Sequence, residues 1–260
     1  MLAHAVTRWE LDYPSLIPLL LLISLYGIGA MRLQQRRPIP HWQMATFGAG
    51  MLCLGIALVS PLETLSHSLF TAHMIQHLIL LVIVPPLCIR ANALLTLLWA
   101  FPFQQRKAIM QGLRRVHLPL WIWLLHAGVM WLWHIPAFYS AALNSPLIHG
   151  LEHFTFFTTA LLYWWVLVYP PRLNYAISIF SAFAMMMQCS LLGMLLTFAN
   201  RPWYLHHQGG LGLTALEDQQ VAGLLMWLPT GLIYLLAAAV LLYQWLEKAP
   251  AVGRNNAGLR

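Results

Sequence analysis

Charged side chains are scarce in this 260-residue chain, where Lys, Arg, Asp and Glu make up 8% of the residues and hydrophobic residues 60%. A soluble globular protein carries roughly 25% charged residues, so this composition excludes an ordinary water-soluble domain. Cysteine is scarce as well: Cys53, Cys88 and Cys189 lie in or beside apolar runs and form no CxxC pair. Neither a disulfide framework nor a thioredoxin-like redox site is therefore expected.

Long apolar runs dominate what remains, and a helix needs about 20 apolar residues to cross the hydrocarbon core of a bilayer. Seven stretches reach that length: 15–31, 42–60, 67–89, 118–137, 149–169, 176–198 and 220–244. Short connections favour an up-and-down bundle. The sequence thus predicts an all-α polytopic membrane protein with seven transmembrane helices, forming one membrane domain over residues 1–260. The first stretch has no cleavage signal and is expected to be retained.

Basic residues predict the orientation of these helices. The net charge is +7, but the basic residues lie between apolar runs, which points to a lipid bilayer and not to nucleic acid. One side holds Arg32, Arg36, Arg37, Arg90, Arg106, Lys107, Arg114, Arg115, Arg172, Lys248, Arg254 and Arg260, and the other holds Arg8 and Arg201. The positive-inside rule places the N-terminus outside and the C-terminus in the cytoplasm. Segment 90–117 then becomes a cytoplasmic basic amphipathic helix, and 199–219 a periplasmic loop.

Two of the apolar runs carry histidine pairs, His73 with His77 and His149 with His153. Residues four apart lie on one helix face, one turn apart. In the predicted orientation both pairs lie near the outer surface, together with His134 on the fourth span. Ionisable groups at membrane depth are costly and mark functional sites by default.

A metal fits this group of residues best, because imidazole suits copper, zinc and iron, and thioethers select Cu(I). We predict a copper site, most simply for Cu(I), whose candidate ligands are His73, His77, His134, His149, His153, Met194 and Met226. Glu152, Asp218 and Gln219 are expected to orient the imidazole N–H groups. His117 and His126 are interpreted as structural, and His67, His206 and His207 as solvated loop residues.

Several runs together resemble the CtaG-type cytochrome c oxidase assembly factors. They are Ser60-Pro61-Leu62, His73-Met74-Ile75-Gln76-His77 before Pro85-Pro86, Trp133-His134-Ile135-Pro136 with Tyr139, His149-Gly150-Leu151-Glu152-His153, Asp218-Gln219-Gln220 and Gly223-Leu224-Leu225-Met226-Trp227. The resemblance covers nearly the whole chain. It implies a non-enzymatic, seven-span protein of the bacterial inner membrane that helps to mature a haem–copper oxidase. The expected partners are the oxidase subunits, and a periplasmic copper chaperone is a further candidate.

Four alternatives stay open at this point. Two histidines from facing helices can ligate haem. His149-Gly150-Leu151-Glu152-His153 also matches the HxxEH zinc-peptidase pattern, with Glu217 as a nominal third ligand. The spans could instead form a transport or proton path, against which the lack of deep charged residues argues. In a metal-free scaffold, the histidines would serve hydrogen bonds only.

Overall fold

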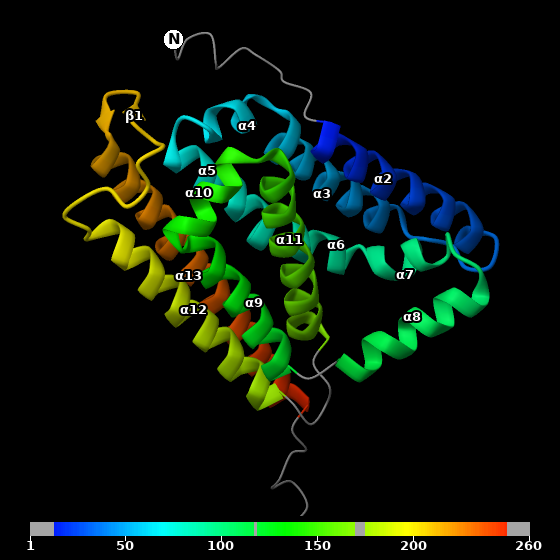
Figure 1. Cartoon of the computed structure of the whole chain (residues 1–260). Helices are drawn as coiled ribbons and strands as arrows, with labels where there is room; N and C mark the ends of the chain where they lie inside the picture. Colours follow the sequence, from blue (N-terminus) through cyan, green and yellow to red (C-terminus); the bar gives the residue numbers. More distant parts are fainter. Residues whose placement is uncertain (1–12, 117–118, 170–174, 249–260) are drawn as a thin grey trace, which may run out of the picture.

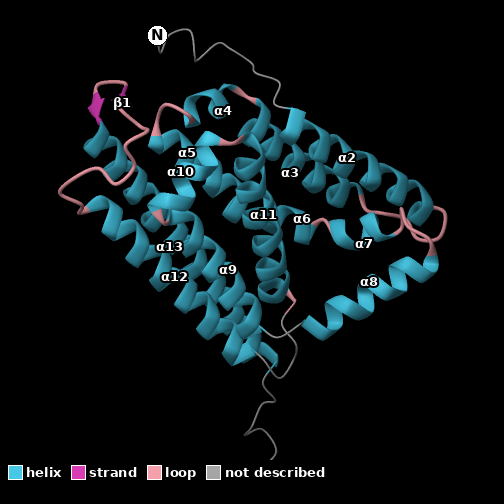
Figure 2. Ribbon diagram, in the orientation of Figure 1, coloured by secondary structure: helices cyan, strands magenta, loops and turns pink. Residues whose placement is uncertain are grey.

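The structure is a computed structural model, and it describes residues 13–116, 119–169 and 175–248. Most of the described residues lie in helices, and one short hairpin is present (Figure 2). The first part of the chain forms α2 (Tyr13–Gln34), α3 (His41–Val59), α4 (Pro61–Ser66), α5 (Phe70–Leu78), the π-helix η1 (Ile79–Ile83), α6 (Val84–Arg90), α7 (Ala93–Leu98) and α8 (Phe103–Val116). The second part forms α9 (Pro119–His134), α10 (Pro136–Asn144), α11 (Pro146–Val168), α12 (Tyr175–Thr197), strands β1 (Gly209–Gly210) and β2 (Leu213–Thr214), and α13 (Ala215–Lys248).

Six helices among the described residues are long and apolar enough to cross a membrane: Leu16–Gln34, His41–Val59, Phe70–Arg90, Pro146–Val168, Tyr175–Thr197 and Ala215–Lys248. A seventh span is obtained if α9 and α10, which meet at an angle of 74°, are counted as one. The predicted all-α, polytopic membrane fold is thereby confirmed. The described residues that follow Arg90, up to Val116, form no such span and contain α7 and α8, and α8 extends as a separate arm (Figure 1).

Prolines shape the helices that carry the histidines. Pro136 disfavours helical backbone at the residue before it, and Ile135 is extended, with φ −67° and ψ 127°. Helix α9 therefore ends at His134, earlier than expected. Pro85 has no N–H to donate back to the carbonyl of Leu81. The indole Nε1 of Trp164 donates to that carbonyl instead, at 2.9 Å, and η1 forms just before the prolines.

The span Phe70–Arg90 lies between two apolar cores. On one side, Leu81 and Val82 pack with residues of α9, α11, α12 and α13. On the other, Leu80 and Val84 pack with residues of α2 and α3. The side chain of Asp218 at the start of α13 bonds to Phe70 at the start of α5, so these helices begin at the same end of the bundle. That end carries the histidines.

Helices α12 and α13 approach each other closely at Gly193 and Gly223. A Cβ atom on Gly223 would lie 2.7 Å from the backbone oxygen of Gly193 and 2.8 Å from the backbone nitrogen of Thr197. Small residues allow helix backbones to approach in this way within membranes. The contact fixes α13, and hence Asp218 and Met226, against the rest of the bundle.

Candidate metal centre

Helices α5 and α11 bring the two histidine pairs face to face. The ring centroids of His73 and His77 are 4.2 Å apart, as are those of His149 and His153. Across the helices, His73 lies 5.8 Å from His149 and His77 lies 5.7 Å from His153. All four side chains are buried. We call these four residues the histidine cluster.

Glu152 contributes a carboxylate to the histidine cluster from α11. It is fully buried, and its Oε1 lies 3.9 Å from Nε2 of His73 and 3.6 Å from Nε2 of His77. Both oxygens of Glu152 and both ring nitrogens of His73, His77 and His153 have no hydrogen-bond partner among the described residues. Burying unpartnered polar groups costs roughly 1–3 kcal/mol each, and more for a charge. These atoms could hold a metal ion.

A second carboxylate, Glu63, approaches the cluster from α4, and sequence reasoning missed it. Ser60 caps α4 by accepting from the N–H of Leu62 at 3.1 Å, which places Glu63 in the first turn. The amide of Gln76 donates both to Glu63 and to the carbonyl of Ala57, the latter at 2.8 Å. The Ser60-Pro61 helix start next to an acidic residue was the available sequence signal.

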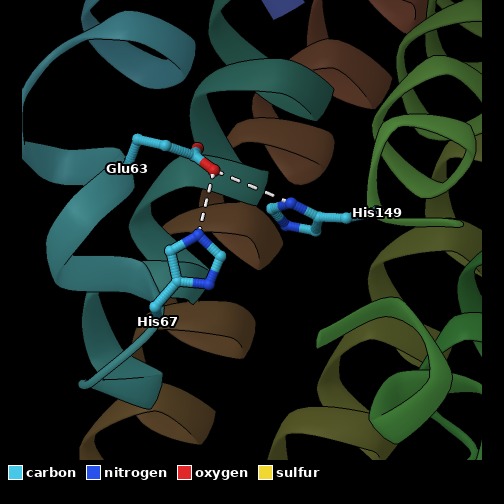
Figure 3. A group of neighbouring side chains, drawn as sticks. All are labelled: Glu63, His67 and His149. Carbon is cyan, nitrogen blue, oxygen red and sulfur yellow. Dashed lines mark ion pairs between the residues drawn. The ribbon is translucent and has the colours of Figure 1, made fainter. Parts of the chain in front are cut away.

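The Oε1 atom of Glu63 lies between two histidines (Figure 3). It is 3.7 Å from Nδ1 of His149 and 3.5 Å from Nε2 of His67. His67 is exposed, as predicted for a loop residue, yet it belongs to this group.

Two groups of three potential metal ligands therefore overlap. One consists of Glu63, His67 and His149, and the other of His73, His149 and Glu152. Within each group the candidate ligand atoms all lie within 4.8 Å of one another. His149 belongs to both. The overlap links an exposed histidine to the buried interior of the histidine cluster.

The remaining predicted ligands divide between the site and the surface. The ring of His134 lies 6.5 Å from that of His77, and Met226 lines a cavity that both histidines border. Met194 is 36% exposed, because Leu192, Gly193 and Leu196 turn the other face of α12 inward. Met194 is not among the residues that line this cavity.

Asp218 and Gln219 were expected to orient imidazoles. Both are buried, as such a role would require, but their hydrogen bonds go to other groups. Asp218 accepts from the backbone N–H groups of Phe70 at 2.7 Å and Thr71 at 3.0 Å, so it caps α5. Gln219 accepts from the N–H of Trp203 at 2.6 Å and fixes the loop. Helix α13 begins at Ala215, earlier than expected, so both residues lie near its start.

The loop after α12 also differs from expectation, because His207 is buried and not solvated. Its Nε2 shares a hydrogen bond with the hydroxyl of Tyr139 on α10, and the Tyr139 ring lies 5.1 Å from that of His73. Burial lowers the pKa of His207 to about 4. Tyr204 donates to the carbonyl of His134 at 2.7 Å. The loop therefore covers one side of the histidine cluster.

His126 is buried and its Nδ1 bonds to the hydroxyl of Thr159, whereas His117 lies outside the described residues. Glu217, the nominal third ligand of a zinc peptidase, is exposed and accepts from the N–H of Thr214 at 2.8 Å. It therefore caps its own helix, away from the histidine cluster.

Fold and site together define a multi-pass helical membrane protein with a buried group of imidazoles and carboxylates able to hold a metal ion. The sequence model of one family, the cytochrome c oxidase caa3 assembly factors (Caa3_CtaG), matches residues 24–248. The chain belongs to this family, which is one of assembly factors and not a known enzyme family. Searches among curated proteins and among solved structures found no significant match.

Proposed function

We propose that this assembly factor binds copper in the histidine cluster and delivers it to the oxidase. The observation that carries the proposal is the state of Glu152, which is buried beside His73 and His77 with neither oxygen hydrogen-bonded within the described part of the chain. A buried carboxylate needs a proton or a cation. The adjacent unpartnered imidazoles are the donors that copper prefers.

The packing of the rings supports a bare ion more than haem. The imidazoles of the histidine cluster contact each other at centroid distances of 4.2–5.8 Å. Two axial histidines of a haem must leave room for the macrocycle between them. Copper also suits membership of a family that assembles a copper-containing oxidase.

The triad of Glu63, His67 and His149, in which His67 is exposed and the other two are buried, is the entry in this proposal. An ion held there needs to exchange only Glu63 and His67 for His73 and Glu152, while His149 stays bound. Such a shared ligand avoids a fully desolvated ion between two sites. A periplasmic copper chaperone is the proposed donor, and oxidase subunits are the acceptor.

This route also requires the orientation predicted from charge. Arg32, Arg90 and Lys248 each lie in the last turn of a helix, and α5, α11 and α13 begin at the end that carries the cluster. With the basic end in the cytoplasm, the cluster faces the outside of the bacterial inner membrane. Labelling of single cysteines by a membrane-impermeant reagent in whole cells tests this orientation.

Oxidase maturation in cells that lack the native protein tests the function. We expect Glu152→Gln to abolish copper insertion, measured as oxidase copper content and activity. His67→Asn should reduce insertion only at low external copper and recover when copper is added, because it removes an entry ligand. His41→Asn, an exposed histidine on α3, is the matched control. Full oxidase copper with Glu152→Gln at normal expression would refute the proposal.

A further inference from the structure

A cavity of about 20 Å³ lies between α5, α9, α12 and α13, next to the histidine cluster. Its lining is rich in sulfur and imidazole groups. The soft donors among the lining residues are Met74, Met130, Cys189 and Met226, and the imidazoles are His77, His126 and His134. A volume of about 10–15 Å³ already accommodates one water molecule, so a single metal ion fits.

Helix α9 supplies a continuous row of potential ligands to this cavity. His126, Met130 and His134 are spaced four residues apart and therefore lie on one helix face, one turn above another. The Sγ atom of Cys189 on α12 lies 4.0 Å from the Sδ atom of Met130. All four side chains are more than nine-tenths buried.

His126 and His134, at the two ends of this row, form hydrogen bonds through Nδ1 that leave the lone pair on each Nε2 available. The hydroxyl of Thr159 donates to the carbonyl of Thr155 at 2.8 Å, so its oxygen accepts from Nδ1–H of His126 at 2.9 Å. Nδ1–H of His134 donates to the carbonyl of Met130 at 2.7 Å. Nε2 of each ring is buried and has no partner in the described ranges of the chain. Such an Nδ1–H bond is the arrangement that orients histidine ligands of metals.

We propose that this cavity is a second metal site, specific for Cu(I), with Cys189 and Met130 as sulfur ligands and the imidazole of either His126 or His134 as the nitrogen donor. Thiolate and thioether ligands select Cu(I) over harder ions. The Cys189 thiol releases one proton to the bulk on binding, so Cu⁺ and thiolate form a neutral unit that suits an apolar bundle. The copper remains Cu(I), and no electron is transferred.

The second site goes beyond the proposed copper cluster, and it rests on that proposal only for the supply of copper. His77 borders both sites. Along the path from His67 to Met130, the available metal ligands therefore change from carboxylate and imidazole groups to sulfur and imidazole groups. This order favours inward movement of Cu(I) and retention of it in the interior, where water and oxidants have least access.

Anaerobic Cu(I) loading of the full-length protein, followed by X-ray absorption and copper analysis, tests the second site. Wild-type protein should show a copper–sulfur shell. Cys189→Ala/Met130→Leu should lose that shell and about one copper ion per chain. Met130→Leu alone conserves volume and should weaken the shell without unfolding. Cys53→Ser/Met187→Leu, which changes a partly buried cysteine and an exposed methionine, should match wild type.

The two copper proposals fail in distinguishable ways. His73→Asn/His153→Asn should lose cluster copper and keep the sulfur shell. If this variant keeps all its copper, the proposed cluster is wrong whatever happens at Cys189. A wild-type spectrum with no sulfur scattering, or an unchanged sulfur shell in Cys189→Ala/Met130→Leu, would overturn the second site.

Discussion

Asp218 links the start of α13 to the start of α5, and replacing it with Asn should destabilise the protein strongly. Its two carboxylate oxygens accept from the N–H groups of Phe70 at 2.7 Å and Thr71 at 3.0 Å. Asn keeps one acceptor and turns an NH₂ group toward the other N–H. Leaving that buried N–H unsatisfied costs about 1–3 kcal/mol. Losing the negative charge at a helix N-terminus adds about 0.3–2 kcal/mol.

Together these effects predict a loss of about 2–4 kcal/mol in the free energy of unfolding. At about 2–4 °C per kcal/mol, the Tm should fall by at least about 4 °C. Thermal unfolding in detergent, followed by circular dichroism, measures the change. Glu247→Gln removes an exposed carboxylate from the same helix and should shift the Tm by no more than about 1 °C. Equal Tm values for both variants would refute the role of Asp218 as the cap of α5.

Other contacts make further predictions for stability. Gly223→Ala should lower the free energy of unfolding by about 1–3 kcal/mol, because the new Cβ atom would meet the backbone of α12. Gly128→Ala, where a new Cβ atom would have no neighbour within 4 Å, should be neutral or stabilising. Similar losses in both variants would contradict the close approach of α12 and α13. Trp164→Phe should lower the free energy of unfolding by about 1–3 kcal/mol, because it leaves a carbonyl of η1 without its hydrogen bond. Trp121→Phe, at an exposed position, should leave the free energy of unfolding unchanged. Chemical unfolding of the two variants compares these values. Tyr139→Phe should speed proteolysis within 199–214 by releasing the buried loop histidine, and an unchanged cleavage rate would show that the loop is held otherwise.

Local periodicity accounts for what the sequence predicted well. The length of the apolar runs predicted the helices. The i,i+4 spacing predicted that His73 and His77 share one helix face, and that His149 and His153 share another. Their facing arrangement depends on how the span Phe70–Arg90, chiefly through η1 and α6, packs against α11, which no local pattern specifies. Counting residues along a helix gives depth in the membrane but not the direction of a side chain. Met194 has the depth counted along its helix, but its side chain is 36% exposed, so its role as a ligand stays a prediction.

The sequence analysis missed the site residues that lie on a short helix or in a loop. Glu63 lies on a six-residue helix, too short for a periodic signal, and becomes buried only when α4 packs over the histidine cluster. His207 lies in a glycine-containing loop whose sequence predicts solvent exposure. Its burial follows from the hydrogen bond to Tyr139, across the bend that Pro136 imposes. Tertiary contacts decide both cases.

Copper content measured by plasma mass spectrometry after anaerobic Cu(I) loading tests the central claim most directly. Purified wild type is compared with His73→Asn/His153→Asn, and with His41→Asn as the exposed control. The account predicts that the double variant binds about one copper ion fewer per chain than wild type, and that the control binds the same amount. Equal copper in the double variant and wild type, or a wild type that binds no copper, would contradict it.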